Sequence, residues 1–419
     1  MRSFKSVSIT VFRLLLISVF IGIFVALFQF LSFQLGAFLK DVFINKVLWK
    51  VIAFFIVFPL IIYYAYHSVN YNKNIIGGGI PALEYNLLYR RDKLNGKKDL
   101  IMMMFSALLT TCTYACLGTV LATSVVMGGN IPLLINEYFK VEDDDSVNIG
   151  MGAAFGAMLL HPLPGIVYCF EEALKKFNIK LLIKSIFMCL IAFGVTYLLY
   201  DYKTFAINIE GYLGLNHWYI FIIIQIAAFI FSTLFAICIL KVKDFAIKHS
   251  KNFFIKYRLV LSFIVFTILA FFIGNYMGSG VGFIKLIFNE TTWYLVLGLV
   301  LFRFVFTILG VNSSATGGVI IPIFAVGAAF EMALTLFLNN FFALDMIYAG
   351  EIVLLSILTF YVSSIETPFI GVALLFAFVG FKESLILFIP TLFMMILASL
   401  ITKLNKYGDV YDLLKRYFK

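Results

Sequence analysis

Long apolar segments with few charged residues dominate the chain and restrict the folds that are open to it. Each is long enough to cross a bilayer as a helix, because a transmembrane helix needs about 20 apolar residues. They run approximately through 10–39, 46–66, 180–200, 217–241, 258–275, 292–310 and 384–403. A water-soluble fold could not bury the apolar surface of 419 residues that are 63% hydrophobic and only 13% charged. The sequence therefore predicts an all-α polytopic membrane protein.

The charged residues predict how the chain is oriented in the membrane. The first apolar segment follows basic residues but is long and lacks a small-residue cleavage site, so we expect a retained span and not a signal peptide. The basic groups are Arg90 to Lys98, Lys175 to Lys184, Lys241 to Arg258 and Lys403 to Lys419. The positive-inside rule places these loops and both termini in the cytoplasm. The acidic loop at 142–145 is expected on the opposite side, and no nucleic-acid partner is needed to explain the charge.

A second set of apolar segments is short or is broken by Gly and Pro. These segments are 76–88, 100–126, 130–138, 150–172, 317–336 and 368–381. Interrupted helices at membrane depth occur only where they are buried in protein or line a polar cavity. Interruptions paired between two halves of a chain indicate a binding site near the membrane midplane.

Two sequence patterns recur in the order that an internal duplication requires. Pro162-Leu-Pro-Gly-Ile is followed by Pro368-Phe-Ile-Gly-Val, and Gly128-Gly-Asn-Ile-Pro has a looser counterpart in Gly317-Gly-Val-Ile-Ile-Pro. Together they favour two halves of inverted topology, at approximately 10–200 and 215–405. We expect a single transmembrane domain over 1–419, with a short cytoplasmic tail at 406–419.

Three Gly-rich stretches suggest an anion site, namely Gly77–Pro81, 118–130 and Gly317–Pro322. A helix N-terminus offers unpaired N–H groups and the positive end of its dipole, and glycine lets an ion approach the backbone closely. We expect binding without a fixed cation, which would hold an anion too tightly for turnover. Close helix packing is the better explanation for any one such motif, but three in one chain favour the anion site. The cysteines and histidines lack metal-ligand spacing, so neither a metal nor a cofactor is expected.

The order of these motifs resembles the CLC family of chloride channels and chloride/proton antiporters, over residues 10 to about 415. Gly77–Pro81 matches the family's GSGIP motif, 118–130 falls at its GREGP motif, and Gly318–Pro322 matches its GxFxP motif. The resemblance implies a CLC-like fold of two inverted repeats with many tilted and interrupted helices. It also implies a homodimer in the lipid bilayer, with one anion pathway per subunit. The implied anion contacts are Gly78, Gly79, Ile80, Ile320, Ile321 and Tyr411.

Departures from the family motifs lie at the predicted pathway. Gly78 replaces the family's serine, and Ile320 replaces an aromatic residue but keeps its N–H group. Counting back from Gly128, the stretch Thr119-Val-Leu-Ala-Thr replaces Gly-Arg-Glu-Gly-Pro, so Leu121 stands at the family's gating glutamate. No acidic residue lies anywhere between Leu100 and Asn136.

Other side chains have more than one interpretation. The hydroxyls of Thr119, Thr123 and Ser124 could line the pathway but cannot titrate. Glu172 matches the family's inner proton-transfer glutamate and Glu171 is its neighbour, but both could simply pair with Lys175 and Lys176 at a helix end.

Four functions follow from these features. The first is passive transport of chloride or a similar small anion, uncoupled from protons. The second is proton-coupled antiport through Glu172, and the third is a transport-inactive paralogue. An intramembrane enzyme would need His161 with Glu171 or Glu172, or Ser313-Ser314, and nothing marks a nucleophile with a paired base there. We therefore do not expect an enzyme. With the resemblance to bacterial-type CLC proteins, we expect the chain to lie in a bacterial plasma membrane.

Overall fold

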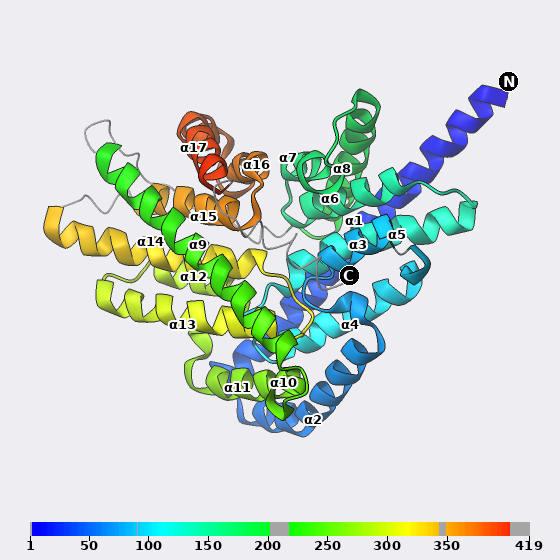
Figure 1. Ribbon diagram of the computed structural model, residues 1–419. Coiled ribbons are helices and arrows are strands. Elements are labelled where there is room, and N and C mark those ends of the chain that lie inside the picture. Colours follow the sequence, from blue (N-terminus) through cyan, green and yellow to red (C-terminus); the bar gives the residue numbers. More distant parts are fainter. Residues whose placement is uncertain (1, 90, 202–217, 343–348, 403–419) are drawn as a thin grey trace.

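The computed structural model describes residues 2–89, 91–201, 218–342 and 349–402, and nearly all of them are helical (Figure 1). Within these ranges the only strand-like contacts are two isolated bridges, Gly77 with Thr316 and Gly118 with Gly318. The prediction of an all-α membrane fold is confirmed. The first eight helices are α1 (Arg2–Phe43), α2 (Leu48–Tyr71), α3 (Ile80–Tyr89), α4 (Gly96–Cys112), α5 (Thr119–Phe139), α6 (Asp144–Met158), α7 (Pro162–Tyr168) and α8 (Ile179–Leu199). The others are α9 (Trp218–Lys248), α10 (Phe253–Lys256), α11 (Arg258–Ile273), α12 (Val281–Ile287), α13 (Trp293–Asn312), α14 (Ile320–Phe342), α15 (Ala349–Ile365), α16 (Pro368–Phe378) and α17 (Phe381–Thr402).

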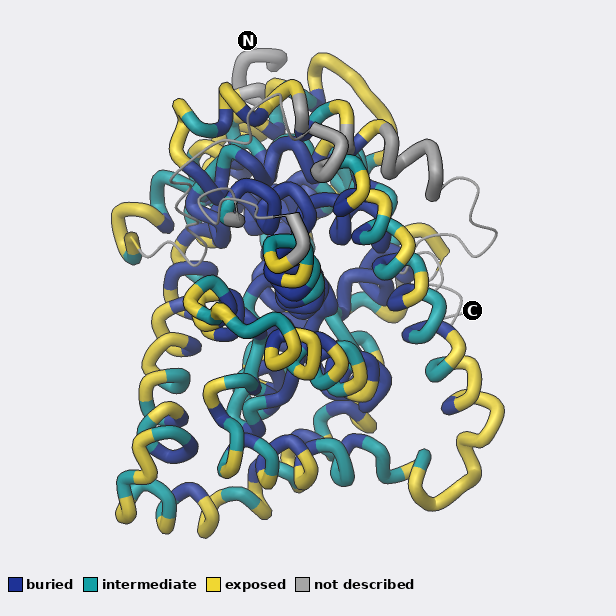
Figure 2. The backbone as a smooth tube through the Cα atoms, turned by 90° about the vertical axis from the view of Figure 1, so that its left-hand side faces the viewer, coloured by how far each residue is buried: buried dark blue, intermediate teal, exposed yellow. Residues whose placement is uncertain are grey.

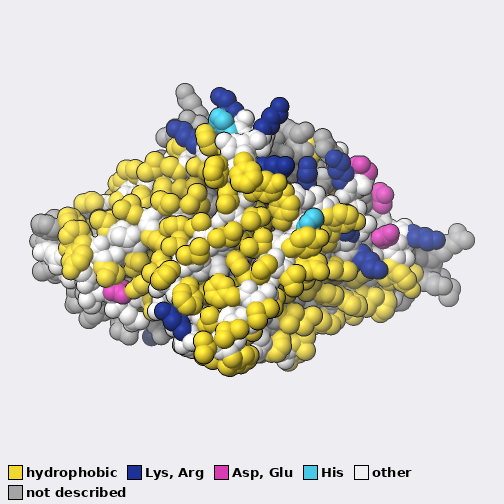
Figure 3. Space-filling model, turned by 90° about the horizontal axis from the view of Figure 1, so that it is seen from below, with side chains coloured by type: hydrophobic (Ala, Val, Ile, Leu, Met, Phe, Trp, Pro, Cys, Tyr) yellow, Lys and Arg dark blue, Asp and Glu magenta, His cyan; other side chains and the backbone are white. Residues whose placement is uncertain are grey.

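Burial separates the central helices of the fold from the helices that surround them (Figure 2). The most apolar window of α5 is 78% buried and that of α14 is 83% buried, whereas the corresponding value for α2 is 22%. The outer helices expose large apolar side chains such as Trp49, Ile56 and Phe272. Figure 3 shows a face covered by apolar side chains, with Lys and Arg mainly along its edges. Lipid is the only solvent that suits such a surface, and α5 and α14 belong to the protein-enclosed centre.

The two halves of the fold are inverted repeats. The order of long and short helices from α2 to α8 recurs from α11 to α17. Gly118 and Gly318, which precede α5 and α14, exchange two backbone hydrogen bonds as an antiparallel pair, with N···O distances of 2.8 and 2.9 Å. The predicted match between the Pro162 and Pro368 patterns agrees with this, because these residues begin α7 and α16.

The predicted break at Gly128-Gly129-Asn130 is wrong. The chain breaks earlier, between Cys112 and Thr119, and α5 continues through these residues to Phe139. A Cβ atom on Gly128 would lie 2.3 Å from the carbonyl oxygen of Gly150 in α6. This glycine therefore allows close helix packing. Residues 128–132 are not the counterpart of 317–322, since that role belongs to the segment at Gly118.

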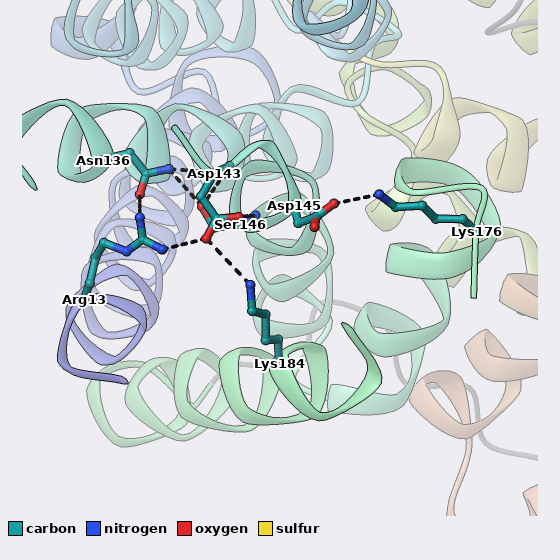
Figure 4. Close-up of polar contacts among 7 residues, drawn as sticks. All are labelled: Arg13, Asn136, Asp143, Asp145, Ser146, Lys176 and Lys184. Atoms are coloured by element: carbon teal, nitrogen blue, oxygen red, sulfur yellow. Dashed lines mark hydrogen bonds and ion pairs between the residues drawn. The ribbon is translucent and has the colours of Figure 1, made fainter. Parts of the chain in front are cut away.

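The acidic loop does not lie apart from the basic residues, contrary to expectation (Figure 4). Asp143 pairs with Arg13 of α1 at 2.6 Å and with Lys184 of α8 at 3.7 Å, and Asp145 pairs with Lys176 at 2.9 Å. Charge sign alone did not predict the side of this loop because its carboxylates serve to hold α1, α6 and α8 together. Asn136 of α5 joins the same cluster through the Arg13 guanidinium.

Candidate functional site: three helix N-termini that meet

The N-termini of α3, α5 and α14 are held together by backbone hydrogen bonds. Gly77 donates its N–H to the carbonyl of Ala315 at 3.0 Å, and Gly317 donates to the carbonyl of Gly77 at 2.7 Å. The Gly118–Gly318 pair adds α5 to this junction. The three Gly-rich motifs, which lie far apart in the sequence, therefore meet at one place, as an anion site requires.

Glycine is needed at this junction for two separate reasons. Gly77 and Gly79 have φ angles of +63° and +72°, a backbone region that other residues enter only with strain. Gly318 has no room for a side chain, because its Cβ would lie 2.4 Å from the Cβ of Ala122. A Cβ on Gly78 would lie 3.3 Å from both Ala122 and the Cα of Gly318, so Gly78 faces the other two motifs directly.

The N–H groups of the first turns supply the electrostatics of the site. The first turn of a helix has no intrahelical acceptors for its N–H groups, which carry the positive end of the dipole. Ile80 begins α3, and Ile320 and Ile321 begin α14; each of the three is at most 2% exposed. The structure thus brings Gly78, Gly79, Ile80, Ile320 and Ile321 together. Tyr411, the remaining predicted contact, lies outside the described residues.

Polar side chains fix the loops that carry the motifs. Asn72 and Asn74 donate to the two carboxyl oxygens of Asp99 at 2.7 and 3.1 Å, which anchors the loop before Gly77 to α4. The hydroxyls of Ser106 and Thr316 lie 2.7 Å apart and join α4 to the loop before α14. These contacts hold the backbone donors in place before any ion arrives.

A cavity of about 60 Å³ lies beside the junction, room for one or two water-sized species. Glycines of the first and third motifs line it, together with Lys243 of α9 and Arg258 of α11. The Arg258 Nε donates to the Ser314 hydroxyl at 2.8 Å. We expected no fixed cation at the site, and that expectation is wrong for this cavity. Both residues belong to a basic group that the sequence analysis took only as a topology signal.

Two fully buried charged residues, Arg303 in α13 and Glu331 in α14, were not among the predicted site residues. Both are 0% exposed. Arg303 donates to the carbonyls of Gly278 and Met277 at 2.8 and 3.3 Å, and its guanidinium lies over the Phe283 ring. Each is a lone charge in a long apolar segment. Such a charge is itself a signal of function in a membrane protein, so both residues could have been identified from the sequence.

The predicted pathway hydroxyls of α5 differ in their partners. Thr119 pairs with Thr111 of α4 at 2.8 Å, and Ser124 donates to the carbonyl of Val120 in its own helix at 2.9 Å. The Thr123 hydroxyl is fully buried without a hydrogen bond to a described residue. Of the three, only Thr123 is left to serve another group.

Leu121, at the predicted gate position, lies in the first turn of α5 and is 1% exposed. Its neighbours are the apolar side chains of the core. The predicted gate position therefore carries a side chain that is neither charged nor titratable.

The glutamate pair lies in a five-residue π-helical turn, Cys169–Ala173, that follows α7. Glu171 accepts hydrogen bonds from the N–H groups of Phe369 and Ile370 at 2.9 and 2.6 Å, so it caps α16 in the other half. The buried Glu172 lies 3.9 Å from the ammonium of Lys175, as the simpler interpretation predicts.

The two serines considered for an enzyme have other hydrogen-bond partners. The Ser313 hydroxyl donates to the carbonyl of Gly310 at 2.6 Å, and the Ser314 hydroxyl accepts from Arg258. His161 is the N-cap residue of α7.

Comparison with known proteins agrees with this architecture. The fold matches the crystal structure of a slow cyanobacterial Cl-/H+ antiporter with a TM-score of 0.85 at 16% identity, covering 97% of each chain. A CLC-type fluoride/proton antiporter gives a TM-score of 0.75 at 19% identity, covering 96% of each chain. The H(+)/Cl(-) exchange transporter ClcA of Vibrio cholerae is 24% identical over 265 residues, 60% of this chain; the chain spans just over half (56%) of that relative.

The family model for voltage gated chloride channels matches residues 60–403. These residues carry all three N-termini of the junction. The chain is an integral membrane protein and belongs to the voltage gated chloride channel family, CLC.

Proposed function

We propose that this protein carries chloride or a similar small anion across a membrane through the junction of α3, α5 and α14. The observation that carries the proposal is the convergence of three first-turn N–H clusters on Gly78, Ala122 and Gly318. Such a site attracts an anion by partial charges, which bind weakly enough to allow release. Arg258, on the wall of the adjoining cavity, adds a positive charge near the site and raises the local anion concentration.

We further propose that the transport is passive. Coupling to protons at this site would need a group that competes with the anion and titrates, and Leu121 does neither. The ion pair with Lys175 gives Glu172 a structural role that needs no proton transfer. A homodimer with one pathway per subunit, in a bacterial plasma membrane with cytoplasmic termini, completes the proposal by analogy with the family.

Purified protein in liposomes with an outward chloride gradient tests the function. Chloride efflux without proton movement is the expected result. Uphill proton movement driven by chloride would contradict passive transport and favour the exchange activity named for the relatives. Absence of flux for chloride, nitrate, bromide and fluoride would favour a transport-inactive protein.

Glu172→Gln is the matched test of the coupled alternative. If proton movement occurs and this substitution abolishes it, Glu172 is the inner proton-transfer group. Under the passive proposal the variant carries chloride like the parent, because no protonation step at Glu172 takes part in the flux.

A further inference from the structure

The carboxyl of Glu331 lies in the middle of α14 and is fully buried. It is three turns from Ile320, so about 16 Å along the helix axis from the N-terminus that faces the anion. Among the described residues its polar contact is the Ser356 hydroxyl of α15. Neither carboxyl oxygen forms a regular hydrogen bond there.

No cation compensates this carboxyl within the described part of the chain. The charged residues on the elements that pack against α14 are Arg303 on α13, Lys285 on α12, Glu351 on α15, Glu137 at the end of α5, and Lys241, Lys243, Asp244 and Lys248 at the far end of α9. Arg303 is committed to two backbone carbonyls, and Lys285 is exposed. A carboxylate buried without a cation at membrane depth is costly, which favours the protonated form.

Two contacts show how α14 and α15 lie against each other around Glu331. A Cβ on Gly327 would lie 3.0 Å from the Cβ of Phe360, and Glu331 contacts Ser356. The same antiparallel register places Thr335 level with the first turn of α15, which carries Glu351. The Thr335 hydroxyl is buried, and no hydrogen bond joins it to a described residue. Thr335, one turn along α14 from Glu331, thus offers a buried hydroxyl between the level of Glu351 and Glu331.

A chain of hydrogen bonds orients the Ser356 hydroxyl that contacts Glu331. Thr359 donates to the side-chain oxygen of Gln225 at 2.6 Å, and the Gln225 amide donates to the Ser356 hydroxyl at 2.8 Å. The Ser356 hydroxyl accepts that bond and remains able to donate its own proton to Glu331. The Ser356 hydroxyl is thus placed to stabilise the Glu331 carboxyl in either protonation state without a cation.

We propose that Glu331 is a proton-binding site whose occupancy sets the anion affinity at the N-terminus of α14. The proposal rests on the proposed anion transport. An ionised Glu331 at about 16 Å lowers the affinity for a monovalent anion roughly fivefold at an effective dielectric constant of about 20. Flux at subsaturating chloride is therefore higher in acid, where Glu331 is neutral, and falls as the pH rises.

The competing explanation is that Glu331 only joins helices through a polar contact. Glu331→Gln separates the two, because glutamine keeps the shape and the contact with Ser356 but resembles the protonated acid at every pH. We expect wild-type flux to change about fivefold with pH, and the variant to keep the acid-limit flux throughout. Glu290→Gln, at a half-exposed turn, is the matched control and keeps the wild-type profile.

A second measurement does not depend on transport. Infrared difference spectra between high and low pH report protonation of a buried carboxyl directly, and we expect a band that Glu331→Gln removes. If neither protein moves anions but the band is present and lost in the variant, the transport function fails and the proton site stands. If the variant keeps both the wild-type pH profile and the band, the proton site is overturned. Flux that follows sodium concentration and not pH, tested by replacing sodium with choline, would also overturn it.

Discussion

The two central helices, α5 and α14, begin at the same place and differ in what they bury. Their N-termini are joined through Gly118 and Gly318, and both helices are enclosed by protein. The first 18 residues of α5 carry no charge, and its Gly128 serves close packing against α6. In contrast, α14 buries a carboxyl three turns from its start. Inverted repeats thus supply two matched sets of backbone donors, while only α14 buries a carboxyl group.

The largest expected effect comes from separating the two N-termini. Gly318→Ala places a Cβ 2.4 Å from that of Ala122, and neither atom belongs to a flexible side chain, so the start of α14 must move away from α5. We expect chloride flux to fall more than tenfold, measured as efflux per folded protein. Gly282→Ala in α12 meets nothing within 4 Å and is the control. Equal flux in both variants would mean that the junction is not the pathway.

The next largest effect is expected when a titratable side chain is placed in the first turn of α5. Leu121→Glu puts a carboxyl in the first turn of α5, where the N–H groups and the dipole stabilise its ionised form. As the pH rises, the carboxylate competes with the anion for these donors, so flux should fall severalfold. The measurement belongs in the Glu331→Gln background, so that the carboxyl of α14 does not contribute. Leu121→Gln is the control, and a flat pH profile for Leu121→Glu would show that this position does not face the anion.

The sequence predicts the apolar architecture well because lipid exposure follows directly from side-chain composition. Gly77–Pro81 and Gly317–Pro322 were correctly placed at helix N-termini, since glycine followed by proline marks a helix start. The break near Gly128 was wrong because whether a glycine ends a helix or packs it depends on the partner. That partner, Gly150 of α6, is known only from the tertiary structure.

Charges were the other source of error, for a similar reason. Arg258 was read as a loop cation, and only the fold shows it on the cavity wall next to Ser314. The acidic loop was assigned by sign, although Asp143 pairs with Arg13 from another helix. Arg303 and Glu331 differ from these, because a single charge within an apolar segment is visible without any structure.

A smaller effect is expected when a hydroxyl is added at Gly78, where the family motif has a serine. Gly78→Ser adds a donor facing Ala122 and Gly318, and a hydrogen bond to a charged group contributes about 1.5–3 kcal/mol. The 3.3 Å approach of the new Cβ to both neighbours offsets part of this gain. We expect the half-saturating chloride concentration to fall about fivefold, from the concentration dependence of efflux. Gly78→Ala has the same Cβ without the donor and should not show the fall; if it does, packing and not hydrogen bonding changed the affinity.

The smallest effect on flux should come from Gly128→Ala, although this change alters α5 itself. Its Cβ would lie 2.3 Å from the Gly150 carbonyl, and crowding of this kind costs about 1–3 kcal/mol of stability. The contact lies more than two turns from the N-terminus, so the anion site keeps its geometry. We expect a lower melting temperature in detergent but wild-type efflux per folded protein. Gly298→Ala, on the exposed side of α13, should change neither quantity. A selective loss of flux in Gly128→Ala would show instead that the pathway extends along α5 beyond its first turns, and the functional contrast with α14 would then weaken.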